Sequence, residues 1–186
     1  MNDARDISDA SFKIDRIQKH NHTFVSKDRF GYLEDDKGDF IPINVYIGVD
    51  VAATATKKSD FQVIMVIGID KNKNRYVLEY FHERIPTFDV PEKIIELAKK
   101  YSPVKRVTIE TVAAAQEMVR DMVTRIATKD RRLMPGIFKG VKPPSGIKKE
   151  DRLETSLGPI VNSKKLYIRS SMTEIVDEFF EHPFAK

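Results

Sequence analysis

Three apolar runs of strand length stand together in the middle of the chain, and alternating helical and strand patterns follow them. The first is a β-branched run typical of a buried strand. The next two are separated by the turn sequence KNKN, which predicts an antiparallel hairpin. The predicted strands are 43–50, 61–70, 75–83, 104–110, a short piece at 137–138 and 165–169, and the predicted helices are 89–100, 113–127, one beginning near 150, and 171–184.

This order restricts the fold class. It predicts an α/β protein whose mixed sheet has an antiparallel three-strand meander, then alternating α and β elements, with flanking helices. That is the order of the ribonuclease H-like fold. We assign residues 45–186 to this domain. Residues 1–44 are polar with few apolar positions, so we expect an N-terminal arm or linker there.

Two of the predicted strands end on a carboxylate. Asp50 closes the run at 43–50 and Glu110 closes the run at 104–110, and each is followed by small residues, VAATAT and TVAAA. If these strands are neighbours, ~5 Å apart, both acids emerge at the same end of the sheet. Two such carboxylates repel each other unless a cation lies between them. Mg²⁺ or Mn²⁺ takes oxygen ligands, and two such ions can promote phosphodiester hydrolysis.

Each acid also has a purely structural interpretation. Aspartate after a strand is common as a turn residue or helix cap, so Asp50 alone does not indicate a metal site. Asp60, just before the second run, either fixes the loop 51–60 or supports the metal ligands from behind. The repeated pattern of a strand ending on an acid favours Asp50 and Glu110 as catalytic residues and metal ligands.

The positive charge of the chain is concentrated after position 119. Residues 120–149 contain nine basic residues against only Asp121 and Asp130. Such a block is typical of a surface that binds a polyanion, although a solvated surface has the same composition. The candidate DNA-binding residues are Arg120, Arg131, Arg132, Lys139, Lys142, Lys148, Lys149 and Arg152.

Several protein classes are excluded by what the sequence lacks. With no cysteine there are no disulfides and no zinc–thiolate sites. No apolar run approaches the roughly 18 residues of a membrane span, and the N-terminus has no signal-peptide pattern. We therefore expect a protein of the cytoplasm without membrane contact. No G-x-x-x-x-G-K-[ST] motif occurs, so we expect no ATP site of that type in this chain.

The motifs resemble the nuclease domain of phage large terminase subunits, the motor-nucleases that package DNA. YIGVDVAATATKKSDFQVIMVIGID resembles the opening of that domain, VTIETVAAAQEMVRDM its second acidic motif, and GIKKEDRLETSLGPIVNSKKLYI its later segment of helix and short strand. Val51 departs from the family, which often has proline there. The resemblance implies an endonuclease that cuts concatemeric double-stranded DNA in the infected host cell. Asp50 and Glu110 would be its first two metal ligands.

The resemblance also implies what surrounds this domain. The segment ISDASFKIDRIQKH resembles the joint after the motor domain, so we expect an excised domain or a split gene, with the motor ATPase domain, portal and small terminase subunit as partners. Fold relatives place a third carboxylate on the last helix, and we expect it beyond Lys186. The acids of that helix in this chain are expected to face solvent: Glu174, Asp177, Glu178 and Glu181. We therefore expect weak metal binding and slow cutting.

Two other functions fit the same residues. A Holliday-junction resolvase or transposase-like nuclease would use the same acids on a branched or specific site. A DNA- or portal-docking module that no longer cuts would need only the basic block. Preference for junctions over linear duplex distinguishes the first, and metal-dependent nicking that Asp50→Ala abolishes distinguishes the second.

Overall fold

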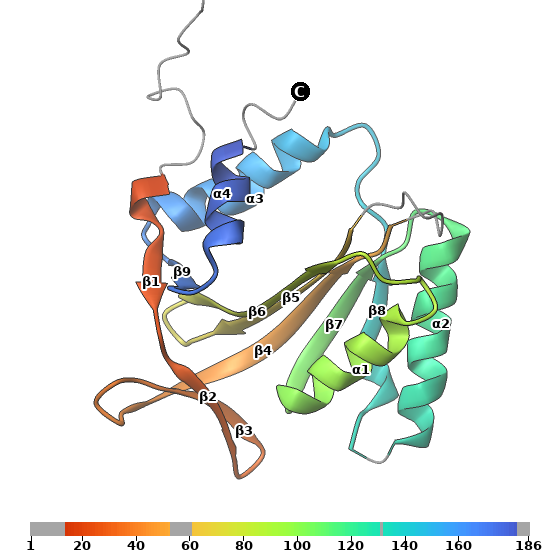
Figure 1. Ribbon diagram of the computed structural model, residues 1–186, viewed down its shortest axis with the longest axis horizontal. Helices are drawn as coiled ribbons and strands as arrows, with labels where there is room; N and C mark the ends of the chain where they lie inside the picture. Colours follow the sequence, from red (N-terminus) through yellow and green to blue (C-terminus); the bar gives the residue numbers. More distant parts are fainter. Residues whose placement is uncertain (1–13, 53–60, 131, 182–186) are drawn as a thin grey trace, which may run out of the picture.

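The computed structural model describes residues 14–52, 61–130 and 132–181. Within these ranges the chain forms a nine-stranded mixed sheet with helices on both faces (Figure 1). The strands are β1 (Gln18–His20), β2 (Thr23–Lys27), β3 (Phe30–Glu34), β4 (Phe40–Asp50), β5 (Gln62–Ile69), β6 (Arg75–Glu83), β7 (Val104–Glu110), β8 (Phe138–Val141) and β9 (Leu166–Arg169). The helices are α1 (Val90–Lys100), α2 (Ala114–Lys129), α3 (Lys149–Asn162) and α4 (Thr173–Glu181), with single 3₁₀ turns η2 (Ile14–Arg16) and η3 (Pro135–Ile137).

The predicted meander is the centre of the sheet. β4, β5 and β6 pair antiparallel in sequence order, and β7 then pairs parallel with β4 on its other side. β8 extends the sheet beyond β7, and β9 extends it beyond β6, both in parallel. The α/β class, the antiparallel meander and the alternation of helices and strands that follows it are therefore confirmed.

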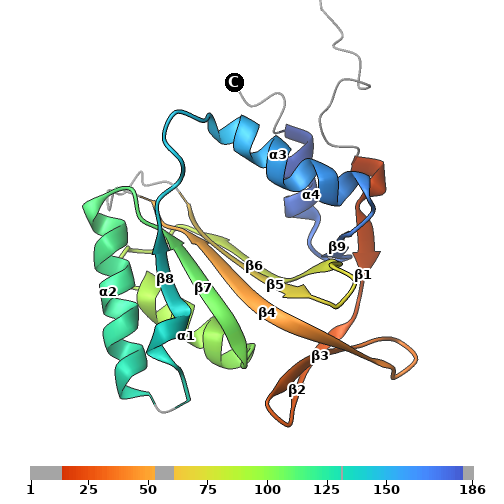
Figure 2. The ribbon, with the colours of Figure 1, turned by 180° about the vertical axis from the view of Figure 1, so that it is seen from behind.

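Two apolar cores lie on opposite faces of the sheet. Alternate residues of β4 (Val45, Ile47 and Val49) are buried against α1 and α2. The smaller core joins α3 and α4 to β6 and β9. Figure 2 shows α3 and α4 together on the face opposite α1 and α2. No helix in the described ranges has the length and apolar character needed to cross a membrane.

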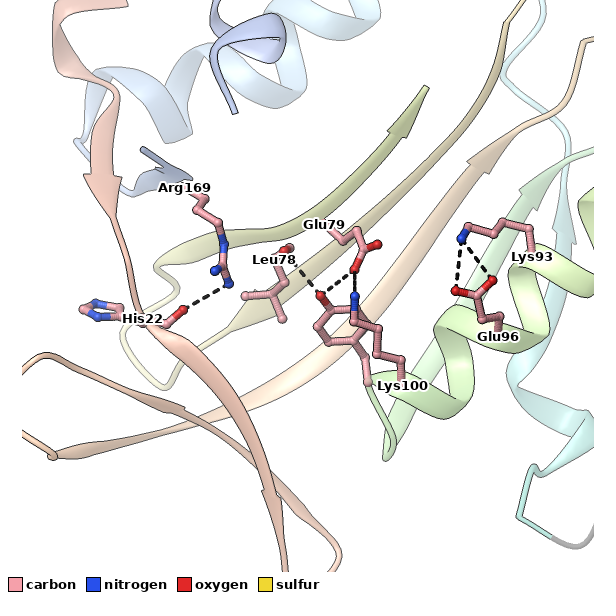
Figure 3. Close-up of polar contacts among 8 residues, drawn as sticks. His22, Leu78, Glu79, Lys93, Glu96, Lys100 and Arg169 are labelled. Carbon is pink, nitrogen blue, oxygen red and sulfur yellow. Dashed lines mark hydrogen bonds and ion pairs between the residues drawn. The ribbon is translucent and has the colours of Figure 1, made fainter. Parts of the chain in front are cut away.

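The predicted arm takes part in the sheet in its described portion. β1 pairs parallel with β9, and the hairpin β2–β3 pairs with the first half of β4. The predicted boundary at residue 44 lies inside β4, whose eleven residues begin at Phe40. An Arg169 guanidinium nitrogen donates to the carbonyl oxygen of His22 at 3.1 Å, which ties this segment to β9 (Figure 3). The division of the chain into arm and domain stays a prediction.

A polar cluster ties the end of α1 to β6 (Figure 3). Lys100 Nζ lies 2.6 Å from Glu79 Oε2, and the Tyr101 hydroxyl donates to the same carboxylate at 2.7 Å. Burial and this hydrogen bond to Glu79 raise the pKa of Tyr101. The cluster fixes the turn that leads from α1 into β7, and therefore helps to hold β7 beside β4.

Candidate functional site

Asp50 and Glu110 end two neighbouring parallel strands. β4 and β7 pair in register up to Val49 and Ile109, so the next residue on each strand is one of the two acids. Val49 and Ile109 are buried against α1 and α2, and because side chains alternate along a strand, both acids face the other side of the sheet. The condition set from the sequence, that these two strands be neighbours, is therefore met, and the roles of the two acids stay a prediction.

Both acids border one open groove. It has a volume of about 440 Å³ and lies on the face of the sheet that carries α3. Its floor includes Gly48 and Thr108, which precede the acids by two residues on β4 and β7. Its wall is made by Val141 at the end of β8, by the next three residues, 142–144, and by Arg152 of α3. We call this the acid groove. The segment from β8 to α3 passes over this end of the sheet (Figure 2).

A buried glutamine connects the two acid-bearing strand ends. Gln116, in the first turn of α2, is 6% exposed. Its Oε1 accepts hydrogen bonds from the backbone N–H groups of Val112 and Ala113, at 2.6 and 2.8 Å, just after Glu110. Its Nε2 donates to the carbonyl oxygen of Val51, at 2.8 Å, just after Asp50. One side chain therefore joins the loop that follows each acid.

A second glutamine holds the backbone after Asp50 from the other side. Gln62, at the start of β5, is 1% exposed, and its Oε1 accepts a hydrogen bond from the N–H of Ala52 at 3.0 Å. Val51 and Ala52 are thus held by Gln116 on one side and Gln62 on the other. We call Gln62 and Gln116 the glutamine clamp. A buried side-chain amide without hydrogen bonds destabilises the fold, so these bonds are maintained and the clamp fixes the loops after Asp50 and Glu110.

Composition and periodicity did not identify the clamp. Glutamine is usually exposed, and a polar residue near the start of a helix is usually interpreted as a cap. Gln116 does accept from the N–H of Ala113, the residue before the helix, as a cap would. The bond to Val51 joins residues 65 apart in the sequence and depends on α2 packing beside β4.

The predicted DNA-binding residues divide into separate groups. Lys142 and Arg152 line the acid groove. Arg152 Nε is buried and has no hydrogen-bond partner in the described part of the chain. Lys139 on β8 and Lys148, just before α3, are exposed.

Arg120 and Arg132 lie elsewhere and carry acidic neighbours. Arg120 on α2 contacts Glu117 and Asp121 at 3.0 and 2.8 Å, and the hydrogen bond to Asp121 raises its pKa. Arg132 pairs with Asp130, which also lies 2.6 Å from Lys99 near the end of α1. Hydrogen bonds from Arg132 and Lys99 hold the pKa of Asp130 well below its usual range. Since β7 begins after α1 and ends at Glu110, Arg132 lies at the end of β7 opposite the acids.

Some predicted positions lie outside the described residues. They are Asp60, Arg131 and the side chain of Lys149. On α4, Glu174 and Asp177 are exposed, while the side chains of Glu178 and Glu181 are outside the description. Asp177 borders a different pocket, beside β1 and β9. In the described ranges no three histidine or acidic side chains gather as a metal site would require.

Comparison with known proteins shows similarity in structure. No protein-family model and no curated protein matches the sequence. The P22 large terminase nuclease domain is similar over 91% of this chain and 77% of its own, with 12% identity and a TM-score of 0.57. The human cytomegalovirus terminase nuclease domain is similar over 74% and 73%, with 10% identity and a TM-score of 0.51. These two likenesses confirm the ribonuclease H-like fold and the resemblance to terminase nuclease domains.

Proposed function

We propose that this chain is the metal-dependent DNA endonuclease domain of a viral DNA-packaging terminase. The observation that carries the proposal is the position of Asp50 and Glu110, at the ends of two neighbouring parallel strands and on one groove. The fold shared with terminase nuclease domains supports it. Double-stranded DNA is the proposed substrate, and a motor ATPase domain, portal and small terminase subunit are the proposed partners.

The donor groups at the groove suit a hard divalent cation. Asp50 and Glu110 offer carboxylate oxygens, which Mg²⁺ and Mn²⁺ prefer, and phosphate or water can fill the remaining positions. When bound, a pair of such ions would activate a water and stabilise the leaving oxygen of the phosphodiester. Two carboxylates bring little charge for two cations, so we expect weak binding by this chain, with a further acidic ligand outside residues 14–52, 61–130 and 132–181.

The cationic wall of the acid groove would hold the DNA backbone. Lys142 and Arg152 border the same groove as the acids, so a phosphate between Asp50 and Glu110 would lie within their reach. A guanidinium fits phosphate oxygens in a two-pronged geometry that an ammonium cannot match. Arg152 borders the groove, and its Nε is buried with no hydrogen-bond partner in the described ranges, so no bond within those ranges holds that atom. Such contacts bind any sequence, as a packaging nuclease needs.

A nicking assay on supercoiled plasmid tests the proposal. The chain with Mn²⁺ should convert supercoiled DNA to nicked and linear forms, whereas Asp50→Asn and Glu110→Gln should each reduce the rate at least a hundred-fold without a change in circular dichroism. Both substitutions keep the size of the side chain and remove its charge. Normal cutting by either variant would overturn the assignment of these acids.

A second comparison separates terminase from resolvase chemistry. Four-way junctions and linear duplexes of equal length are supplied together, and the products of each are measured. A terminase nuclease should cut both at similar rates, since its contacts are to the backbone. Strong preference for the junction would support a resolvase instead. Binding of DNA with no cutting in either metal would support a docking module.

A further inference from the structure

A cluster of aromatic and cationic side chains lies just before β5 and at the end of β6. The Phe61 and His82 rings have centroids 4.1 Å apart, and Arg84 Cζ lies 4.4 Å from the centre of the Phe61 ring. Tyr80 lies next to His82, with ring centroids 5.5 Å apart. We call Phe61, His82 and Arg84 the aromatic step.

The strand register places the aromatic step on the same face as the acids. Asp50 pairs with Val63 across β4 and β5, and Val63 pairs with His82 across β5 and β6. Residues directly opposite each other in antiparallel strands carry their side chains on one face. His82 is therefore in one row with Asp50, two strand spacings or ~10 Å away. Glu110 continues that row on the other side of Asp50.

Phe61 is not placed as a core residue. It is 41% exposed, and it packs into neither of the two apolar cores that the described residues form. Arg84 is exposed as well, and its guanidinium stays over the ring. A flat ring with a cation at its face, open to solvent, is the arrangement on which nucleobases stack without regard to sequence.

The acids thus lie between two surfaces of different chemistry. On one side Lys142 and Arg152 offer cations at the acid groove, whose described lining contains no aromatic side chain. On the other, Phe61 and His82 offer rings together with the cation of Arg84. The first suits a phosphate backbone and the second suits an exposed base. A strand crossing the acids from one surface to the other would meet both.

We propose that the aromatic step holds an unstacked base of the DNA strand whose phosphate lies at Asp50 and Glu110. This rests on the proposed nuclease function and adds the state of its substrate, which is DNA locally opened at the cutting position. The ~10 Å between Asp50 and His82 corresponds to about three nucleotides at 3.4 Å per stacked nucleotide, and to fewer in a strand that is opened and stretched. The base is held by stacking on Phe61, with Arg84 contributing charge.

The test uses oligonucleotides that carry 2-aminopurine at successive positions around the cut, because its fluorescence reports stacking. The full chain is mixed with these DNAs in Ca²⁺ to limit cutting, and both affinity and fluorescence are recorded. Phe61→Leu removes the ring and keeps an apolar side chain, and Arg84→Gln removes the charge. The matched control is Phe88→Leu, since Phe88 is 63% exposed and lies two residues before α1, which packs on the opposite face.

We expect about ten-fold weaker binding of mismatched or single-stranded DNA by Phe61→Leu, which corresponds to the loss of one base–aromatic stack. The affinity of Phe61→Leu for fully paired duplex should fall less. The change in 2-aminopurine fluorescence that wild type causes on binding should disappear in Phe61→Leu. Phe88→Leu should match wild type in both affinity and fluorescence. Arg84→Gln should weaken binding several-fold, and it provides the test if Phe61→Leu misfolds. If wild type cuts DNA while the variants keep its affinity and its 2-aminopurine fluorescence, the proposed role of the aromatic step is wrong and the proposed nuclease function is retained. If wild type neither binds nor cuts DNA, both proposals fail.

Discussion

Gln116 shows how one side chain can set the geometry of a site without touching a ligand. Its three hydrogen bonds reach the loops behind Asp50 and Glu110, so the separation of the two carboxylates depends on its position. A cation shared by two carboxylates requires that their oxygens be held at a fixed spacing. Side chains that orient metal ligands from behind typically change metal affinity or activity 10–100-fold when they are removed.

Replacing Gln116 by leucine should therefore lower Mn²⁺ affinity and cutting together. We expect a loss of at least ten-fold in each, and a loss of about 1–3 kcal/mol in unfolding free energy, because the carbonyl of Val51 and two backbone N–H groups lose their partner. Mn²⁺ binding is measured by electron paramagnetic resonance and stability by urea denaturation. Gln116→Glu keeps the acceptor for Val112 and Ala113 and should show a smaller effect.

Gln18→Leu is the matched control for Gln116. Gln18 Nε2 donates to the carbonyl of Arg16, in a segment that pairs with β9, and contacts neither acid-bearing loop. It should leave metal binding at the wild-type level. If Gln116→Leu loses stability but binds Mn²⁺ as tightly as wild type, Gln116 serves the fold and does not position the acids.

At the scale of elements, the segment from β8 to α3 matters more than the total charge of the basic block. Lys142 and Arg152 border the acid groove, whereas Arg132 lies at the opposite end of β7 and is paired with Asp130. Charge at a distance greater than a Debye length, ~8 Å at physiological salt, contributes little to holding a phosphate at the acids. The block is one stretch of sequence but not one surface.

Salt titrations of DNA binding test this division. Substituting both Lys142 and Arg152 by glutamine should weaken binding to duplex and lower the slope of log affinity against log salt by about two, since each lost phosphate contact removes about 0.9. Arg132→Gln should leave the slope unchanged. Fluorescence anisotropy between low and high salt measures both. Equal slopes for the double variant and wild type would mean that the DNA lies on another surface.

The sequence predicted those elements whose side chains have a clear periodicity. β4 to β7 are rich in β-branched residues and end on turn residues or acids, so their existence and the position of Asp50 and Glu110 at strand ends followed from the pattern. β2 and β3 are half-exposed, and the turn between them has positive φ at Asp28 and Arg29, where glycine or asparagine would be expected. The β2–β3 hairpin therefore lacked the turn residues by which a hairpin is usually predicted from sequence.

The side chains that surround Asp50 are set by the pairing register of the strands, which cannot be read from the sequence. That His82 shares a row with Asp50 follows from two strand pairings, and a shift of one residue in either would place its ring on the other face. Similarly, the Gln116 bond to Val51 depends on how α2 packs against the sheet. An acid at a strand end can be recognised from the sequence, because it depends only on position along one strand. Contacts between elements cannot be recognised in this way, because they depend on how the elements pack.

At the scale of the whole molecule, a buried histidine joins the N-terminal strands to the sheet. His20 on β1 is 4% exposed, and its Nε2 lies 3.1 Å from the carbonyl oxygen of Val77 on β6. Its Nδ1 is buried with no hydrogen-bond partner among the described residues. The rings of His22 and Tyr76 lie next to it, with centroids 5.3 and 5.6 Å away.

Burial lowers the pKa of His20 from 6.5 to about 4, with smaller contributions of the same sign from His22 and Arg169 and an opposing one from the Val77 carbonyl. The folded chain therefore keeps this imidazole neutral at pH values where the unfolded chain protonates it. Between pH 6.5 and 4 the unfolded state binds more protons, so stability falls as pH falls through that window. Above pH 6.5 the histidine contributes no pH dependence.

Unfolding of wild type and His20→Gln by urea at several pH values between 7.5 and 4 tests this linkage. The unfolding free energy of wild type should fall by up to about 3 kcal/mol more than that of the variant across the window, at 1.36 kcal/mol per unit of pKa difference. Other groups titrate there too, and the difference between the two proteins removes their common contribution. Parallel curves would show that His20 is protonated equally in both states. A difference confined to the window would make the packing of β1 against β6 and β9 the acid-sensitive part of the fold. Asp50 is set apart from that part, since it pairs with Val63, whereas Val77 pairs with Ile67, four residues further along β5.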